Sequence, residues 1–385
     1  MISSRVEQLS SSATLKITAL TKKLKKEGKD VVNFAAGEPD FDTPIFIKEK
    51  AKKAIDDGLT KYTPSAGTNE LREAIARKLK EENGILCEGA NIIVTAGAKY
   101  AIFAAMSAFL NPKEEVLIPA PYWVSYPEMA ILCGAKSKII KTKEREGFKL
   151  TAGALSKAIG KKTKLLILNY PSNPTGLTYS EQELKEIYDI VKDKGIIVLS
   201  DEIYEVLTYD GKKHISFASI GDAQKFTVTV NGFSKSFSMT GWRMGYLCAD
   251  QNFSGAILKL IDHTTSCASS ISQAAALAAI NDKTWPIEMR AKFENRRNLL
   301  WEGLKGLKKI KPLRPAGTFY MLCDIKKSGL SSMDFSSQLL DRHLVSTIPA
   351  DSFGAEGFVR LSFATSNDDI NKGIARLKTF LEELK

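Results

Sequence analysis

The middle of this chain alternates short apolar runs with amphipathic segments, and this alternation limits the folds that the chain can adopt. Between several of the apolar runs, hydrophobic residues recur at helical spacing, as in Glu181–Lys194. Strands separated by helices predict an α/β fold with a mainly parallel seven-stranded sheet flanked by helices. The predicted strands are Ile92–Thr95, Glu115–Pro119, Ser137–Lys141, Leu165–Asn169, Ile196–Ser200, Phe226–Val230 and Gly245–Ala249.

The C-terminal third has a different pattern, which is typical of a smaller α+β domain. A helical segment over Thr284–Leu307 precedes three short apolar runs, and a helix closes the chain over Asp368–Lys385. A chain of 385 residues exceeds the size at which one core stops growing, so we expect two domains. The N-terminal helix, about Thr14–Glu27, is expected to join the smaller one. The three apolar runs are Thr318–Asp324, Val345–Pro349 and Phe358–Phe363. The predicted boundaries are an N-terminal segment 1–44, a large domain 45–280 and a small domain 281–385.

Charge and cysteine content argue against several classes of protein. The net charge is +11, but the basic residues are scattered over helical surfaces, so we expect no nucleic-acid partner. The five cysteines form no CxxC pair, and the three histidines form no HExxH motif, so no metal site is predicted. No apolar stretch reaches about 20 residues, and the N-terminus lacks the apolar core of a signal peptide. The prediction is a cytoplasmic protein without a membrane partner.

Polar residues that follow the predicted strands are the candidate site residues, because ligands of such sheets bind beyond the carboxyl ends of the strands. Lys235 is the most unusual of them. It follows the strand Phe226–Val230, lies among serine, glycine and aromatic residues, and precedes Arg243 by eight positions. Burial and a nearby cation both lower the pKa of a lysine, which frees its amine to attack a carbonyl group.

Two further strand ends suggest contacts to a phosphate and to a planar ring. Gly97-Ala98-Lys99 opens a helical run, where free backbone N–H groups suit a phosphate. A plain strand-to-helix turn is the alternative interpretation. Trp123 follows another strand and could stack on a ring or simply pack in the core.

Two polar side chains at other strand ends suggest hydrogen-bonding and charged partners. Asn173 lies between two prolines in the segment 169–176, which fixes its amide, although a turn also explains the segment. Asp201 ends a buried strand, where a carboxylate is costly unless a cation or a protonated ring nitrogen pairs with it. The alternative for Asp201 is a helix N-cap. Taken together, the candidates fit an anionic, planar, carbonyl-bearing heteroaromatic cofactor, and pyridoxal 5'-phosphate meets each requirement.

With these motifs the sequence resembles the class I aminotransferases of fold type I, in the aspartate aminotransferase group, and the branch that includes aspartate/prephenate aminotransferases. The resemblance covers nearly the whole chain. The matching motifs are Ala36–Phe41, Lys61–Pro64, Pro121–Tyr126, Asn173–Gly176, Ser200–Tyr204, Ser234-Lys235 with Gly241–Arg243, and Arg360–Phe363.

The resemblance implies a role for each matching cofactor residue. Lys235 is the lysine that bonds to the cofactor and carries the proton, and Asp201 keeps the pyridine nitrogen protonated. Asn173 and Tyr204 bind the 3-oxygen, and Trp123 stacks on the ring. The phosphate is expected to contact Gly97, Ala98, Lys99 and Arg243, and Tyr62 of a neighbouring subunit in a homodimer with shared active sites.

The resemblance also implies how amino acids and 2-oxo acids bind. Arg360 holds the substrate α-carboxylate with help from Gly37, Asn173 and Trp123. Thr14 and Lys99 together favour a dicarboxylate, although a helix N-cap and a surface lysine explain them singly. The sequence differs from the family pattern at one position expected to bind the phosphate. Gly232 stands where many relatives have a serine, which removes one hydrogen bond to the phosphate.

The predicted reaction is a ping-pong transfer of the amino group between L-aspartate and 2-oxoglutarate. Prephenate is a second acceptor that the Thr14 and Lys99 pair leaves open. The alternatives within the fold are an aromatic or alanine aminotransferase and a C–S β-lyase. A DNA-binding regulator with an aminotransferase-like domain is the alternative outside enzymes, and it would require a separate DNA-binding domain.

Overall fold

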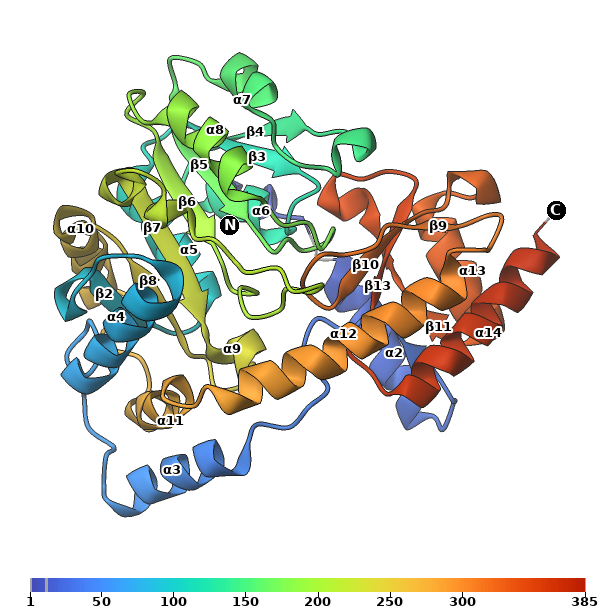
Figure 1. Ribbon diagram of the computed structural model, residues 1–385, viewed down its shortest axis with the longest axis horizontal. Helices are drawn as coiled ribbons and strands as arrows, with labels where there is room; N and C mark the ends of the chain where they lie inside the picture. The colour runs from blue at the N-terminus through green and yellow to red at the C-terminus, as the bar shows by residue number, and fades with distance from the viewer. Residues whose placement is uncertain (1, 11–12, 385) are drawn as a thin grey trace.

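The structure is a computed structural model that describes residues 2–10 and 13–384, apart from the side chains of residues 13–16 and 18. The seven predicted strands of the middle of the chain form one sheet in the order β2-β8-β7-β6-β5-β3-β4 (Figure 1). Only β8 in this sheet runs antiparallel to its neighbours. The predicted fold class is therefore confirmed. The strands are β2 Ile92–Thr95, β3 Glu115–Ala120, β4 Lys136–Lys141, β5 Thr163–Asn169, β6 Ile197–Asp201, β7 Thr227–Gly232 and β8 Gly245–Cys248.

The central strands consist of nearly continuous apolar runs because this part of the sheet is buried on both faces, whereas the edge strand β4 is more polar and more exposed. Along β5, Leu165 and Ile167 pack with α5, α6 and α10, whereas Leu166 and Leu168 pack with α7 and α8. Helices α3, α4 and α11 cover the end of the sheet formed by β2 and β8. These helices are α3 Ile45–Asp56, α4 Asn69–Asn83, α5 Ala98–Phe109, α6 Ser125–Leu132, α7 Ala152–Ala158, α8 Glu181–Val191, α10 Gln251–Asp262 and α11 Ser270–Ile280.

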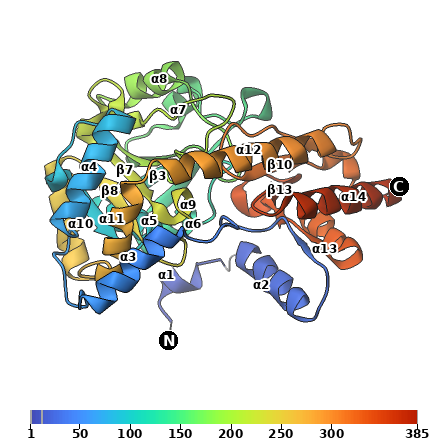
Figure 2. The ribbon, with the colours of Figure 1, turned by 60° about the horizontal axis from the view of Figure 1, so that its bottom comes forward.

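The C-terminal third forms a second sheet, in the order β12-β13-β10-β9, that packs with α12 and α13, and α14 packs on these two helices and on the strand pair β1 and β11. The long helix α12 reaches from α11 to this sheet (Figure 2). The N-terminal segment contacts this part of the molecule, because β1 pairs with β11 and α2 contacts β12. The elements are α2 Ala13–Lys26, β1 Val32–Asn33, α12 Thr284–Leu304, β9 Lys311–Pro312, β10 Tyr320–Asp324, α13 Ser332–His343, β11 Val345–Ser346, β12 Ile348–Pro349, β13 Phe358–Ser362 and α14 Asn367–Glu383.

Two predicted strands of the C-terminal third differ from the structure. The run Val345–Pro349 divides at Thr347 into β11, which pairs with β1, and β12, which pairs with β13. The run Thr318–Asp324 starts as a strand only at Tyr320, because Thr318 adopts a left-handed conformation with φ of 62°. The domain boundaries at residues 44 and 280 stay a prediction.

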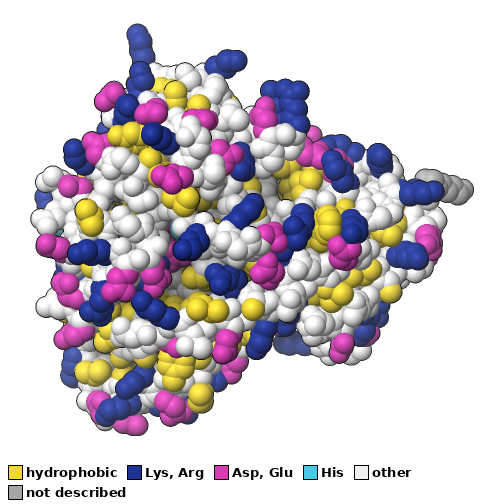
Figure 3. Space-filling view, viewed as in Figure 1, with side chains coloured by type: hydrophobic (Ala, Val, Ile, Leu, Met, Phe, Trp, Pro, Cys, Tyr) yellow, Lys and Arg dark blue, Asp and Glu magenta, His cyan; other side chains and the backbone are white. Residues whose placement is uncertain are grey.

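The surface carries charges of both signs. On the face shown in Figure 3, Lys and Arg side chains are interspersed with Asp and Glu. Within the described part of the chain, no helix has the length and hydropathy needed to cross a lipid bilayer.

Candidate active site

A cavity of about 310 Å³ lies at the edge of the large sheet where the parallel strands end. The parallel strands bring residues far apart in sequence to this edge. Because β8 runs in the opposite direction, its first residue, Gly245, lies at the same edge and brings Arg243 to the cavity. Most of the predicted site residues line the cavity: Gly37, Ala98, Lys99, Trp123, Asn173, Asp201, Tyr204, Lys235, Arg243 and Arg360.

Lys235 projects into this cavity from α9 (Phe233–Ser236), a single helical turn that follows β7. Its Nζ donates a hydrogen bond to the carbonyl oxygen of Gly37 at 2.6 Å. Burial lowers the pKa of Lys235 to about 8, and Glu38 opposes this shift. At this pKa about a tenth of the side chain is a neutral amine at pH 7, which is more than a hundred times the fraction of an ordinary lysine, and the neutral amine is the nucleophilic form.

Asp201 is the last residue of β6, and its carboxylate is buried beneath the cavity. Its Oδ2 accepts a hydrogen bond from the Tyr126 hydroxyl at 2.6 Å, and its Oδ1 accepts one from the Ile203 amide at 3.3 Å. Burial raises the pKa of Asp201 to about 6, so the group is mostly ionised at neutral pH. Among the described residues, no Lys or Arg lies within ion-pair distance of this carboxylate. A protonated ring nitrogen is a suitable partner for it.

Arg360 reaches the opposite side of the cavity from β13 and is only 2% exposed. Its Nη1 donates to Asn173 Oδ1 at 2.9 Å, and the guanidinium lies 4.1 Å from the centre of the Tyr320 ring. Its buried Nε has no hydrogen-bond partner. A buried guanidinium with a free donor fits a planar carboxylate, which accepts two parallel hydrogen bonds.

The first turn of α5, which includes Lys99, lies beside Arg243 and forms a positively charged part of the cavity. Gly97 precedes the helix with φ of 87°, and a Cβ at this position would lie 2.5 Å from Arg243 Nη2, so only glycine lets the guanidinium approach. The amides of Ala98 and Lys99 precede the first hydrogen bond of the helix, which Tyr100 N–H donates to the Gly97 carbonyl. Lys99 Nζ lies 4.9 Å from the centre of the Trp123 ring. Free amides and two cations at a helix start suit a phosphate.

Comparison with known proteins identifies the family. The sequence pattern described as "Aminotransferase class I and II" matches residues 29–377. The chain belongs to this family. It is therefore a pyridoxal-phosphate-dependent aminotransferase, since the family uses that cofactor.

The relatives of this aminotransferase match it over its whole length. It is 42% identical to an aspartate aminotransferase of Bacillus subtilis over 389 residues, covering 99% of both chains. It is also 42% identical to a probable aspartate/prephenate aminotransferase of Aquifex aeolicus, covering 100% of this chain and 99% of the relative. The structure of the aspartate aminotransferase of Thermus thermophilus with maleate superimposes with a TM-score of 0.95 at 38% identity, covering 98% of this chain and 99% of that one. The predicted family and fold are confirmed.

Three predicted residues of the aminotransferase are not among those that line the cavity. Gly97 lies behind the Arg243 guanidinium. Tyr62 is 90% exposed and lies in the loop between α3 and α4. Thr14 belongs to α2, but its side chain lies outside the described residues.

Sequence reasoning missed two tyrosines of the cavity. Tyr126 hydrogen-bonds Asp201, and the Tyr320 hydroxyl lies 3.1 Å from that of Tyr204. The position of Tyr126 three residues after Trp123 was an available signal. Tyr320 lies in an apolar run and had no such signal.

The structure explains the glycine at position 232. A Cβ there would lie 2.8 Å from the Gly245 Cα and 2.9 Å from the Met244 oxygen, so β7 and β8 leave no room for a serine. Ser234, two residues later, is buried and lines the cavity.

Proposed function

We propose that this aminotransferase exchanges the amino group between L-aspartate and 2-oxoglutarate, giving oxaloacetate and L-glutamate, with pyridoxal 5'-phosphate bound in the 310 Å³ cavity. One observation supports the proposal most directly: besides Lys235 and Arg243, which is assigned to the phosphate, the cavity contains two further cations, Arg360 and Lys99. A substrate with two carboxylates can pair with both.

The donor set of the cavity fits the cofactor. Asp201 would pair with the ring nitrogen, Asn173 and Tyr204 would bind the 3-oxygen, and Trp123 would lie on the ring. Arg243 and the amides of the 97–99 segment would hold the phosphate, with Gly97 keeping the approach open. When bound, the cofactor supplies an electrophilic carbonyl carbon and a ring that accepts electrons.

Lys235 is the group that moves the proton. Its amine attacks as a neutral nucleophile, and burial increases that neutral fraction. Once the substrate amine displaces it from the cofactor, Nζ would be free to take a proton from the substrate α-carbon and pass it to the cofactor, and it would reverse this transfer when the 2-oxo acid is aminated. The Gly37 carbonyl holds Nζ on the cavity side of α9.

The two cations orient the substrate. Arg360 binds the α-carboxylate, and Asn173 fixes the plane of its guanidinium through the 2.9 Å hydrogen bond. Lys99, with Thr14, binds the distal carboxylate. Burial lowers the pKa of Lys99, and Arg243 contributes to this shift. Prephenate also has two carboxylates, so it is the second acceptor to test.

We expect Lys99→Ala to raise the KM for 2-oxoglutarate and oxaloacetate about tenfold or more, because a charge-assisted contact is lost. The KM for phenylpyruvate, which has one carboxylate, should stay unchanged. The measurement is an acceptor panel of 2-oxoglutarate, oxaloacetate, prephenate and phenylpyruvate, with aspartate or glutamate as donor.

Two controls belong to this panel. Lys157→Ala removes an exposed lysine of α7 and should change no acceptor. Cofactor affinity is measured separately, because Lys99 also lies near the residues expected to hold the phosphate. An unchanged ratio between dicarboxylic and monocarboxylic acceptors would refute the specificity proposal. Release of pyruvate and ammonia from cysteine without amino transfer would indicate a β-lyase instead.

We further propose a homodimer in which the exposed Tyr62 reaches the phosphate of the neighbouring subunit. Tyr62→Ala should then weaken cofactor binding, and Lys235→Ala should abolish activity. Mixed dimers of the two variants restore one intact site, because Lys235 and the neighbouring Tyr62 come from different chains. At a cofactor concentration too low to load the Tyr62→Ala homodimer, we expect activity to appear on mixing after dissociation and reassembly. Activity that stays absent in verified mixed dimers would show that the site is not shared in this way.

A further inference from the structure

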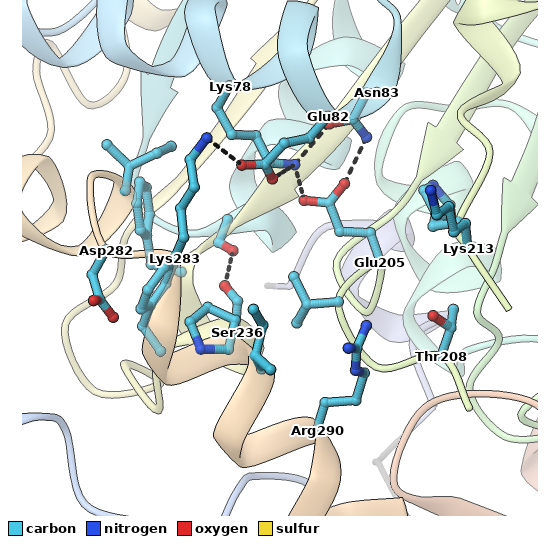
Figure 4. A pocket seen from close by; sticks show the side chains of 18 of the residues that line it. Lys78, Glu82, Asn83, Glu205, Thr208, Lys213, Ser236, Asp282, Lys283 and Arg290 are labelled. Atoms are coloured by element: carbon cyan, nitrogen blue, oxygen red, sulfur yellow. Dashed lines mark hydrogen bonds and ion pairs between the residues drawn. The ribbon is translucent and has the colours of Figure 1, made fainter. Parts of the chain in front are cut away.

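A second cavity, of about 350 Å³, shares α9 with the substrate cavity, and we call it the rear pocket (Figure 4). Gly232, Phe233, Ser236 and Phe237 line the rear pocket, whereas Ser234 and Lys235 line the substrate cavity. The short helix that carries the reactive amine is thus a wall between two spaces. The volume of the rear pocket is within the range of small-molecule sites, about 300 to 1,000 Å³.

The acids of the rear pocket already have partners. Glu205 forms an ion pair with Lys78, and Asn83 donates to Glu205 Oε2 at 2.6 Å. Glu82 lies 3.8 Å from the ammonium of Lys283. Asp282 accepts a hydrogen bond from the first turn of α12 at 2.9 Å. Glu82 and Glu205 therefore have cationic partners, several of these contacts being visible in Figure 4, whereas Asp282 contacts only backbone amides.

Three cations of the rear pocket have no such partners. Arg290 points into the space from α12 in Figure 4 and is half-buried. In the described part of the chain, neither it nor Lys212 or Lys213 makes a hydrogen bond or an ion pair through its side chain. The unbalanced charge of the rear pocket is therefore positive.

Much of the remaining wall is apolar. The apolar and aromatic lining residues are Val206, Phe233, Phe237, Tyr246, Ile280, Pro286 and Ile287. Ile287 and Arg290 are three residues apart on α12, so they present an apolar and a cationic group on the same face of that helix. A matching ligand has an apolar body and one anionic head. A planar carboxylate suits a guanidinium best, because it can accept two parallel hydrogen bonds.

We propose that the rear pocket binds a small apolar monocarboxylate, held by Arg290, and that its occupancy alters the active site through α9. A ligand that packs on Phe233 and Phe237 restrains the turn that positions Lys235. Coupling between two sites is reciprocal, so ligands of the substrate cavity should also change affinity at the rear pocket. The proposal goes beyond amino transfer and does not depend on the identity of the amino acid substrate.

The test is calorimetric titration of the holoenzyme with phenylacetate as the probe. Because Arg360 can also attract a carboxylate, the comparison uses Arg360→Gln, which removes that site, and Arg290→Gln in both backgrounds. Ile287→Glu is the second rear-pocket variant, since Ile287 is 56% exposed and tolerates a polar side chain. The matched control is Arg145→Gln, a highly exposed arginine far from the lining residues.

We expect phenylacetate to bind Arg360→Gln, and Arg290→Gln or Ile287→Glu to weaken that binding about tenfold or more. Hydrogen exchange of the segment 233–237 should slow when the probe binds. Should Arg360→Gln fail to fold, the unsubstituted holoenzyme should bind two probes per chain and Arg290→Gln one. The proposed rear-pocket site is contradicted if Arg360→Gln alone abolishes phenylacetate binding. It is also contradicted if neither Arg290→Gln nor Ile287→Glu changes the affinity. Binding without any change in exchange at 233–237 overturns the coupling. None of these measurements requires turnover, so they stand apart from the proposed reaction.

Discussion

We expect Lys235→Ala to slow amino transfer by about 10⁴-fold or more, because the chain then loses both its nucleophile and its proton carrier. No other described lysine amine combines burial with a pKa lowered to about 8. Lys99 also lines the cavity, but its Nζ lies over the Trp123 ring. A substitute base is therefore absent from the position that Lys235 occupies.

The measurement is single-turnover absorbance spectroscopy of the cofactor. Aspartate should convert the bound cofactor to its amino form in the unsubstituted enzyme, and 2-oxoglutarate should reverse the change. Lys259→Ala, an exposed lysine of α10, is the control for general effects of the substitution. Partial rescue of Lys235→Ala by added methylamine would separate the chemical role from a structural one. A complete cycle at the normal rate in Lys235→Ala would eliminate the proposed mechanism.

The second large effect concerns Asp201, where activity and stability should change in opposite directions. Asp201→Asn keeps an oxygen that can accept the Tyr126 hydrogen bond but removes the charge that would pair with a protonated ring nitrogen. We expect amino transfer to fall by a factor on the order of 10² to 10⁴. The cofactor-free protein should become more stable, because a buried carboxylate without a cationic partner is costly.

The raised pKa of Asp201 determines how the stability difference between the two proteins changes with pH. Burial raises the folded-state pKa of Asp201 from 3.8 to about 6. A raised pKa means that the acid stabilises the fold below about pH 4, and that this stabilisation is lost as the pH rises to about 6. The asparagine does not titrate. The gain in the free energy of unfolding of Asp201→Asn over the unsubstituted protein should therefore grow between about pH 4 and pH 6. Above about pH 6 it should stay constant at roughly 1 to 3 kcal/mol.

Chemical denaturation of the cofactor-free protein at pH 5 and pH 7.5 tests the stability part. The control is Asp193→Asn, which removes the charge of an exposed aspartate and should leave the stability unchanged. If Asp201→Asn is less stable than the unsubstituted protein at pH 7.5, the buried carboxylate does not destabilise the cofactor-free protein, and the prediction is wrong.

Much of the candidate site was predictable because its residues are of types that are unusual at their positions along the chain. Lys235 and Asp201 stand out as charges at the ends of buried strands, and Gly97 stands out as a glycine at a helix start. Tyr320 resembles an ordinary core aromatic in the sequence, and Tyr126 differs from one only in its position three residues after Trp123. They join the site only through partners 75 and 116 residues away in the sequence.

The sequence by itself determined the secondary structure pattern, the fold class, the family and a set of candidate site residues. These depend on side-chain periodicity and residue type, which are local properties. Only the tertiary structure decided the antiparallel direction of β8 that brings Arg243 to the cavity, and the packing of β7 on β8 that requires Gly232. It also decided the burial that sets the pKa values of Lys235 and Asp201, and the place of α9 between two cavities. The physical reason is that strand pairing, burial and cavities arise from contacts between distant segments, which no local pattern encodes.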